Sequence, residues 1–297
     1  MKILCYHGVS KYKNFGLVNF SKKHISKNEF YQQIKYAKKN CNILSIKQVY
    51  LHLKKKIPFK KNSVCISFDD GFKNNFDVAV PILRKFKVPA VFYICPEIIE
   101  EQKMFWVDKI EACILFTSKK NIYFYVNKKK IIFNIENNKK KIETIIKIKK
   151  RCKKTYDFKK DQIINDLIKS SGIKPSISLN KNYRVATWPQ INRVMKNKLF
   201  TIGGHSLNHS ILTNLTKKKL EEDILDTIKL IKKRTGFRIQ HFSYPEGRYN
   251  SIVIKILKKN KILSSPKAHG INNTYLENSF ELKRVMVGFN NTKFPFK

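Results

Sequence analysis

Short apolar runs alternate with amphipathic stretches through the first third of the chain, and this alternation constrains the fold more than any other feature. Residues 64–68 and 88–94 are compact apolar runs, and the stretch between them, at about 75–86, has a helical pattern. A strand, a helix and a second strand in this order predict parallel pairing, because parallel neighbours need a long crossover connection. A further apolar run at 2–6 extends the pattern. We therefore expect an α/β fold with a parallel sheet or barrel.

Two helices are expected between the first two predicted strands. Ser26 and Glu29 have the spacing of a capping box, which predicts a helix from this point to about residue 39. A second, shorter helix is expected at 45–54. Each lies between predicted strands, as a crossover helix of a parallel sheet does.

The middle of the chain departs from this pattern and becomes dense in lysine. A hairpin is expected at 122–126 and 131–135, and lysine-rich helices near 138–153 and 158–170. We interpret approximately 100–183 as an α+β insertion packed on the scaffold; a small second domain is the alternative. Beyond Trp188 the α/β pattern returns, with these expected elements: a helix to about 197, a strand at 199–202, a helix at 216–234, a strand at 239–243, a helix at 250–259, and short strands near 262 and 285. We expect 1–297 to form a single domain.

Net charge is the most extreme property of the composition. The 297 residues include 62 Lys and Arg against 21 Asp and Glu, a formal charge of +41. Such a charge favours polyanionic partners. Base and phosphate recognition, however, relies on the planar guanidinium of Arg, and here lysine dominates along the whole chain. We therefore expect solvated lysine-rich faces and no specific nucleic acid, with the insertion steering a phosphate-bearing or anionic-lipid-linked substrate.

Several other classes of protein are excluded by pattern. There is no apolar run near the roughly 20 residues of a membrane span, and residues 1–8 become polar too early for a signal peptide. The six cysteines are scattered without a C-x-x-C pair, which favours reduced thiols. We therefore expect a cytoplasmic protein, with peripheral contact at the inner face of an anionic membrane. A G-x-S-x-G elbow, a P-loop and a G-x-G-x-x-G motif are all absent.

Three polar segments each follow a predicted strand, where parallel α/β folds collect their sites. The first places Asp69 and Asp70 directly after the buried run at 64–68. Adjacent carboxylates repel one another and are hard to explain by packing, although an acidic turn at a helix start is the simpler alternative. The second places His205 and His209 four residues apart, on one face if the segment is helical. Two imidazoles and a carboxylate suit a divalent metal with open positions.

The third segment, Phe242 to Gly247, is a turn bracketed by Pro245 and Gly247. Its backbone N–H groups could face an oxyanion. Most turns of this composition have no such role, so the segment gains meaning only from the other two.

In this order the segments resemble the NodB-homology polysaccharide deacetylases, carbohydrate esterase family four, and in particular the polysaccharide-biosynthesis-cluster branch. Ser67 to Gly71 matches the S/T-F-D-D-G motif, His205 to His209 the H-S/T-x-x-H metal motif, and Phe242 to Gly247 the Pro-Tyr-Gly-like turn. Further matches lie at Tyr6-His7 (Y-H-x-V), at Phe105-Trp106-Val107-Asp108 (F-W-x-D) and at Leu282-Lys283-Arg284 (L-x-R). The resemblance implies a distorted (β/α) barrel of the NodB type that carries the lysine-rich α+β insertion.

The resemblance also implies roles for individual residues. The metal would be held by Asp70, His205 and His209; Zn²⁺ suits this set, and Co²⁺ or Mn²⁺ also fit. Asp69 would be the general base. The turn residues implied in oxyanion or substrate binding are Tyr244, Pro245, Glu246 and Gly247.

Two further roles depend on departures from the family pattern. No L-x-H follows His209, so the resemblance to branches with rearranged motifs assigns the general acid to His7, with His269 as a second candidate and a structural histidine as the alternative. The family's base-orienting arginine falls on Ser243. Arg284 is favoured as its substitute over Arg248.

The implied function is a metal-dependent hydrolase that removes the N-acetyl group from a sugar of a surface polysaccharide or lipopolysaccharide precursor. Its substrate would be a lipid- or nucleotide-linked glycan. The alternative is a catalytically silent protein on the same scaffold that binds glycan, membrane or nucleic acid through its basic surface; the intact acid pair and both histidines favour the enzyme.

Overall fold

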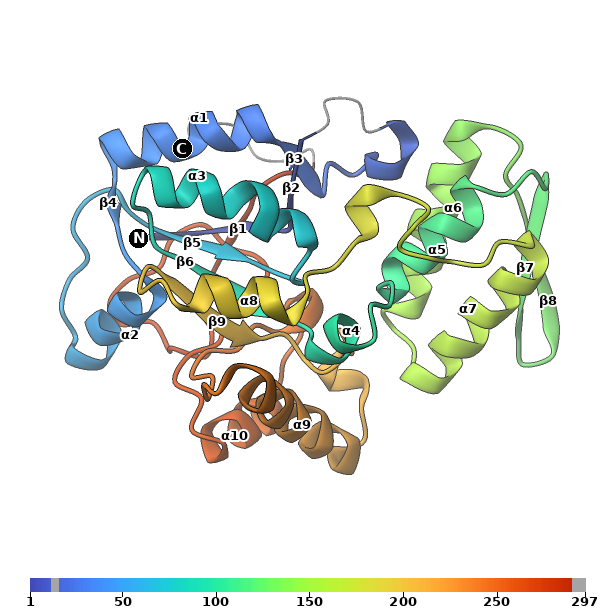
Figure 1. The fold of residues 1–297 in the computed structure, drawn as a ribbon. Coiled ribbons are helices and arrows are strands. Elements are labelled where there is room, and N and C mark those ends of the chain that lie inside the picture. Colours follow the sequence, from blue (N-terminus) through green and yellow to red (C-terminus); the bar gives the residue numbers. More distant parts are fainter. Residues whose placement is uncertain (12–15, 290–297) are drawn as a thin grey trace.

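The computed structural model describes residues 1–11 and 16–289, which are organised around one parallel sheet (Figure 1). The strands lie in the order β10-β1-β5-β6-β9, and β4 also pairs with β5. Their bounds are β1 Lys2–Tyr6, β4 Asn42–Ile43, β5 Ser63–Phe68, β6 Ala90–Ile94, β9 Phe200–Gly204 and β10 Val285–Met286. Strands β5 and β6 are buried at every residue, as strands covered on both faces are, which explains their unbroken apolar sequence.

Isolated bridges carry the sheet round from β9 back to β10. The pairs are Gly204 with Phe242, His241 with Ser264, and Pro266 with Leu282, all parallel. Leu282 lies shortly before β10, and β10 pairs with β1, so the strands form a distorted barrel. The carboxyl ends of its strands meet at one rim, where parallel barrels place their functional loops.

Helices flank the barrel on both sides (Figure 1). Their bounds are α1 Lys27–Asn40, α2 Ile46–Lys55, α3 Val80–Lys85, α4 Pro96–Glu100, α8 Trp188–Met195, α9 Lys217–Thr235 and α10 Ser251–Lys259. The predicted capping box opens α1: the Ser26 hydroxyl accepts from the Glu29 N–H at 3.1 Å, and the Glu29 carboxylate accepts from the Ser26 N–H at 2.8 Å. The helix expected at about 75–86 instead begins with a π-helical turn, Asn75–Ala79, before α3.

Shorter elements complete the barrel. Strands β2 Gly8–Ser10 and β3 His24–Ser26 form a separate parallel pair beside β1. Single turns of 3₁₀ helix lie at Gly16–Asn19, Lys181–Tyr183, Leu212–Asn214 and Pro245–Gly247. The strand predicted at 239–243 is reduced to isolated bridges, because there the chain only closes the barrel and has no long partner.

The lysine-rich insertion forms a second packed unit beside the barrel (Figure 1). It consists of α5 Trp106–Leu115, the hairpin β7 Asn121–Val126 and β8 Lys129–Asn134, α6 Asn138–Cys152 and α7 Asp157–Ser171. This unit has its own apolar core, in which Ile114, Phe124, Ile148 and Leu167 are buried. The predicted hairpin and both predicted helices are therefore present, and they enclose a core separate from the larger one of the barrel.

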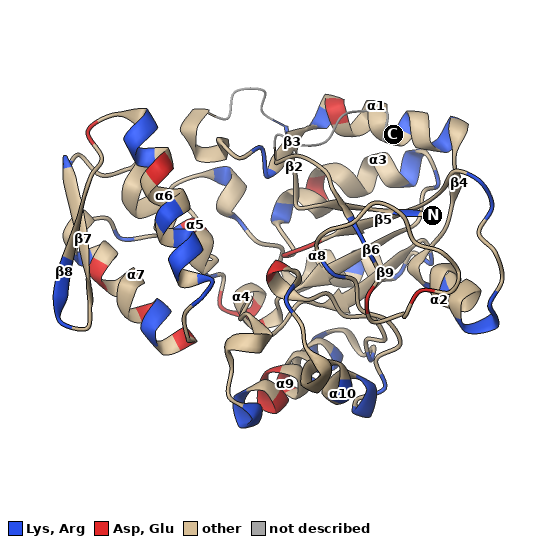
Figure 2. Cartoon of the chain, turned by 180° about the vertical axis from the view of Figure 1, so that it is seen from behind, with Lys and Arg blue, Asp and Glu red and all other residues tan. Residues whose placement is uncertain are grey.

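Basic residues are spread over the helices of both units (Figure 2). Exposed lysines occur on helices of the barrel and of the insertion alike, which agrees with solvated surfaces more than with one localised patch. The six cysteines are free thiols, five of them buried. Within residues 1–11 and 16–289, no helix is both long and apolar enough to cross a membrane.

Candidate metal centre and active site

The turn after β5 separates the two neighbouring acids. The Asp69 N–H donates to the Tyr6 carbonyl at 2.9 Å, which continues the β1–β5 pairing by one residue. Asp70 then adopts a left-handed conformation (φ 73°), and Gly71 follows at φ 87°. Non-glycine residues seldom adopt this conformation and do so most often at functional sites. The turn directs the two carboxylates to different partners.

The histidine segment after β9 is a turn and not a helix. The two histidines therefore do not meet on one helical face, as they would if the segment were helical. Ser206 and His209 both have positive φ, at 59° and 65°, and this backbone brings the imidazoles together (ring centroids 5.0 Å apart). The glycine before the segment is a steric requirement. A Cβ on Gly203 would lie 2.5 Å from the Tyr93 ring and 2.7 Å from the His241 carbonyl oxygen.

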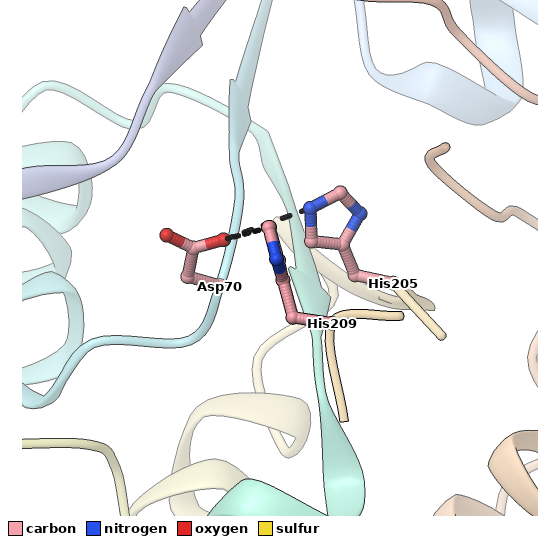
Figure 3. A group of neighbouring side chains, drawn as sticks. All are labelled: Asp70, His205 and His209. Carbon is pink, nitrogen blue, oxygen red and sulfur yellow. Dashed lines mark ion pairs between the residues drawn. The ribbon is translucent and has the colours of Figure 1, made fainter. Parts of the chain in front are cut away.

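Asp70, His205 and His209 face one another in a buried cluster (Figure 3). The Asp70 Oδ1 atom lies 3.6 Å from His205 Nε2 and 3.4 Å from His209 Nε2. Ligands 2.0–2.1 Å from a tetrahedral ion are separated by about 3.3 Å, so the Asp70 oxygen is spaced from each imidazole nitrogen much as one ligand is from another. All three candidate ligand atoms lie within 4.8 Å of one another. The Nδ1 atom of His205 contacts the Ser243 carbonyl at 2.8 Å, which leaves Nε2 for the cluster, as a fixed tautomer requires.

The electrostatics of this cluster fit a divalent cation. Burial raises the pKa of Asp70 well above its usual range and lowers the pKa of His205 and of His209. Neutral imidazole is the form that binds metal. Asp70 Oδ1 and His209 Nδ1 are buried and have no hydrogen-bond partner in the part of the chain that the structure describes. A bound cation would satisfy the carboxylate and reverse its pKa shift.

The other acid of the pair, Asp69, is held by Arg284. Two parallel bonds of 2.7 Å join the guanidinium to both carboxylate oxygens, and both side chains are buried. Burial alone would raise the pKa of Asp69, but the Arg284 guanidinium, with His205 and His7, holds it well below its usual range. Of the two arginines considered from the sequence, Arg284 forms this pair; Arg248 instead donates to the Lys153 carbonyl at 2.5 Å.

Ser243, which stands where the sequence motif would have an arginine, also contacts Asp69. The Ser243 hydroxyl donates to Asp69 Oδ2 at 3.4 Å, and His205 Nε2 lies 3.7 Å from the same oxygen. Asp69 therefore lies next to the cluster that would hold the metal. Its carboxylate is oriented by bonds that do not involve the ion.

His7 follows β1 and lines the same cavity. Its Nδ1 atom has no hydrogen-bond partner among residues 1–11 and 16–289, and its ring meets Phe289 edge-on with centroids 5.0 Å apart. Desolvation lowers the pKa of His7 to about 3, against the opposing effect of Asp69. His7 thus favours the neutral imidazole in the cavity that it shares with the acids.

The turn at residues 244–247 offers fewer free N–H donors than the sequence implied. The N–H groups of Tyr244 and Gly247 already donate to backbone carbonyls, and Pro245 has none. Among the four residues, Glu246 alone retains an N–H without such a bond, in a left-handed conformation at φ 56°. Its carboxylate pairs with Lys153 of α6 at 2.7 Å.

A cavity of about 1010 Å³ brings these groups together. The predicted residues that line it are His7, Asp69, Asp70, His205, His209, Tyr244, Glu246, Gly247, His269 and Arg284; Pro245 and Arg248 do not. Sequence reasoning missed the residues that the loop before β3 and the insertion contribute, namely Lys23, Glu111, Lys149, Lys150 and Lys153. Lysines are so frequent in this chain that no local signal marks these few.

Lys23 is the missed residue that the segment before β3 contributes. Its ammonium lies 2.5 Å from the buried Asp108 carboxylate and 4.8 Å from the centre of the Phe72 ring. Burial would lower the pKa of Lys23, but Asp108 and Glu111 outweigh it and raise the pKa. The ion pair joins the barrel to α5. Asp108, the acid of the F-W-x-D segment, therefore has a structural role as the partner of Lys23.

A parallel barrel with a buried acid–histidine cluster at its rim defines the NodB type of (β/α) barrel. The protein-family model described as "Polysaccharide deacetylase" matches residues 56–155 and 157–263. The chain therefore belongs to the polysaccharide deacetylase family. A poly-beta-1,6-N-acetyl-D-glucosamine N-deacetylase of Staphylococcus aureus (strain MSSA476) is 32% identical over 179 residues, which cover 53% of this chain and 61% of the relative. The chain thus spans less than two thirds of the length of the curated relatives it matches.

Solved structures share the fold at low identity. A Streptococcus pyogenes deacetylase, PplD, in complex with acetate superposes with a TM-score of 0.64 at 16% identity, over 98% of this chain and 93% of the other. IcaB from Ammonifex degensii superposes with a TM-score of 0.61 at 16% identity, over 96% and 91%. These superpositions extend over the insertion as well as the barrel.

Proposed function

We propose that the protein is a metal-dependent deacetylase that hydrolyses the N-acetyl group of a sugar in a surface polysaccharide or its precursor. One observation carries the proposal: a carboxylate fixed by Arg284 lies 3.7 Å from an imidazole of a buried Asp–His–His cluster, inside a cavity large enough for a glycan. The names of the curated relatives support the choice of an N-acetylated glucosamine polymer.

The cluster fits a resident ion held by Asp70, His205 and His209. When bound, a divalent ion would polarise the acetyl carbonyl and make a water molecule more acidic. Zn²⁺ matches the ligand types, and Co²⁺ and Mn²⁺ are the alternatives. The remaining chemistry belongs to side chains and backbone of this chain.

Asp69 is the proposed general base. Both of its oxygens are engaged by Arg284, which keeps the carboxylate ionised at neutral pH and out of the ligand set. A carboxylate in this position accepts a proton from the attacking water as the C–O bond forms. The Glu246 N–H would donate to the negative charge that develops on the acetyl oxygen, and one such donor contributes about 3–4 kcal/mol to the transition state.

His7 is the proposed general acid for the leaving amine. With a pKa of about 3 it is neutral at rest, so it must first take up the proton released at Asp69 and then pass it to nitrogen. Asp69 favours the charged imidazole, which makes this order of transfers electrostatically consistent.

The test of the proposed function is acetate release coupled to metal content. Chelation should abolish acetate release from an N-acetylglucosamine oligomer, and Zn²⁺, Co²⁺ or Mn²⁺ should restore it. Asp70→Asn should remove the ion and lower kcat/KM by about 10³-fold or more, because the ion supplies several kcal/mol. Asp226→Asn, on the exposed face of α9, is the matched control. Full activity after chelation would overturn the proposal, and salt-sensitive retention on polyanions without bound metal would favour the silent binding protein.

His7→Gln should lower kcat for an acetamido sugar by about 10²–10⁴-fold, because the amine cannot leave unprotonated. The loss should shrink to less than about tenfold for an aryl acetate, whose phenolate needs no proton. Parallel kinetics on the two substrates measure this difference. His269→Gln tests the second candidate in the same way. If the loss of kcat depends on the leaving group in the His269 variant and not in the His7 variant, His269 and not His7 is the general acid.

The linkage of the substrate and its compartment are further proposals. We propose a lipid- or nucleotide-linked precursor, handled in the cytoplasm at the inner membrane face. Cell fractionation followed by immunoblotting measures the compartment directly. A protein found only outside the cell would contradict this part alone.

A further inference from the structure

One face of α6 forms a wall of the catalytic cavity. Ile146, Lys149, Lys150 and Lys153 all line the cavity, and their spacing places them on one side of the helix. We call these four residues the α6 wall. The helix belongs to the insertion, so the cavity is shared between the barrel, which holds the acids and histidines, and the second packed unit.

Two salt bridges fix the α6 wall in place. Lys149 pairs with the nearly buried Glu111 of α5 at 2.5 Å, and Lys153 pairs with Glu246 at 2.7 Å. The second bridge joins the wall to the turn that contains the proposed oxyanion donor, the Glu246 N–H. Lys150 lies between the two pairs. Within residues 1–11 and 16–289 it has no carboxylate partner, and its side chain is exposed to the cavity.

The cavity has an excess of positive charge before any metal binds. Among the described residues, its lining holds six cationic side chains (Lys2, Lys23, Lys149, Lys150, Lys153 and Arg284) and four acidic ones (Asp69, Asp70, Glu111 and Glu246). A dication in the cluster would double that excess. A neutral glycan has no group that could pair with this positive charge. Clefts lined by charges of one sign concentrate ligands of the opposite sign.

The size of the cavity points beyond the reacting sugar. At about 1010 Å³ it reaches the upper end of the range for pockets that enclose a drug-sized ligand, about 300–1,000 Å³. The space along the α6 wall is therefore available for a group attached to that sugar. Ile146, which is 54% exposed, offers an apolar contact beside the lysines.

We propose that the α6 wall is a subsite for an anionic group, a phosphate or a carboxylate, carried by the glycan next to the sugar that loses its acetyl group. Lys150 is its specificity-determining residue, and the paired Lys149 and Lys153 position the helix and add to the field. The proposal rests on the proposed function, because it takes the ligand to be an N-acetylated glycan.

The test compares three N-acetylglucosamine tetramers on the intact protein: a neutral one, one with a terminal phosphate ester, and one with a terminal hexuronate. The wild type should show a KM about tenfold lower for at least one anionic tetramer, as expected for hydrogen bonds to a charged group. Lys150→Glu should abolish that preference, and added salt should weaken it. Preference for phosphate identifies a phosphate-linked precursor, and preference for hexuronate identifies an acidic polymer.

Lys147→Glu is the control, because Lys147 is exposed on the same helix but outside the cavity, and it changes the net charge equally. Equal KM values for the three tetramers on the wild type would overturn the proposal. An equal loss of preference in the Lys147 and Lys150 variants would overturn it as well, since net charge alone would explain the result. If no tetramer releases acetate, the proposed function fails, while calorimetric titration of the same tetramers into the same protein still measures the preference for anions.

Discussion

Arg284→Met should lower the free energy of unfolding by about 3–5 kcal/mol at neutral pH. The substitution leaves Asp69 as a buried carboxylate without its cation, and breaking a buried pair has a cost of this size. Chemical denaturation of the wild type and the variant measures the difference. Arg193→Met, on the exposed face of α8, should change stability by less than about 0.5 kcal/mol.

The stability difference between the wild type and Arg284→Met should depend on pH. In the wild type the pKa of Asp69 lies below its usual value of 3.8, so the pair stabilises the fold at neutral pH and loses that contribution only as pH falls through the lowered value. In the variant, burial without Arg284 raises the pKa of Asp69, and protonation relieves the uncompensated charge. The stability difference should therefore be largest near pH 7 and shrink toward pH 4. A difference that is constant with pH would show that lost packing, and not charge, causes the destabilisation.

Asp69→Asn should lower kcat for deacetylation by about 10²–10⁴-fold, the usual contribution of a general base. Asparagine has nearly the same shape but cannot accept the proton from water. The metal content should stay unchanged, because the proposed ligands are Asp70, His205 and His209. Steady-state kinetics together with elemental analysis of the same preparation separate the loss of base from the loss of metal.

Unfolding must be distinguished from chemistry in this variant, because Arg284 then loses its partner. The double variant Asp69→Asn, Arg284→Met replaces both charges and should recover part of the stability, as neutral replacements of buried pairs do. It should recover no activity. Activity of Asp69→Asn within tenfold of the wild type would exclude Asp69 as the base.

Elements with a local signal were predictable from the sequence. The capping box at Ser26 and Glu29 marks a helix start by itself, and the apolar runs of β5 and β6 are explained by burial on both faces. The residues of the Asp–His–His cluster were predictable because their types and order match a family pattern. Their geometry was not, since His205 and His209 meet through a turn with positive φ at Ser206 and His209 and not through helical spacing.

Long-range partners were harder to predict. Arg284 pairs with Asp69 across 215 residues, and its sequence context distinguishes it from Arg248 only through the resemblance. Lys23 has no context that separates it from the other lysines; its role appears when the loop before β3 packs against α5. Likewise, the bridges at Phe242 and Ser264 close the barrel through pairings too short to show a strand pattern.

The separate core of the insertion divides the work of the protein between two units. The barrel supplies the acids and imidazoles, whereas the neighbouring unit supplies the α6 wall and packs mainly around its own side chains, with Ile211 of the barrel added to them. Polar contacts also join the two units, among them Lys153 with Glu246 and Ser210 with Asp157. Under the proposed function, substitution of Lys150, which makes no contact with the acids or imidazoles that the structure describes, should therefore change the selectivity for glycans and leave the arrangement of the acid and imidazole side chains in the barrel unchanged.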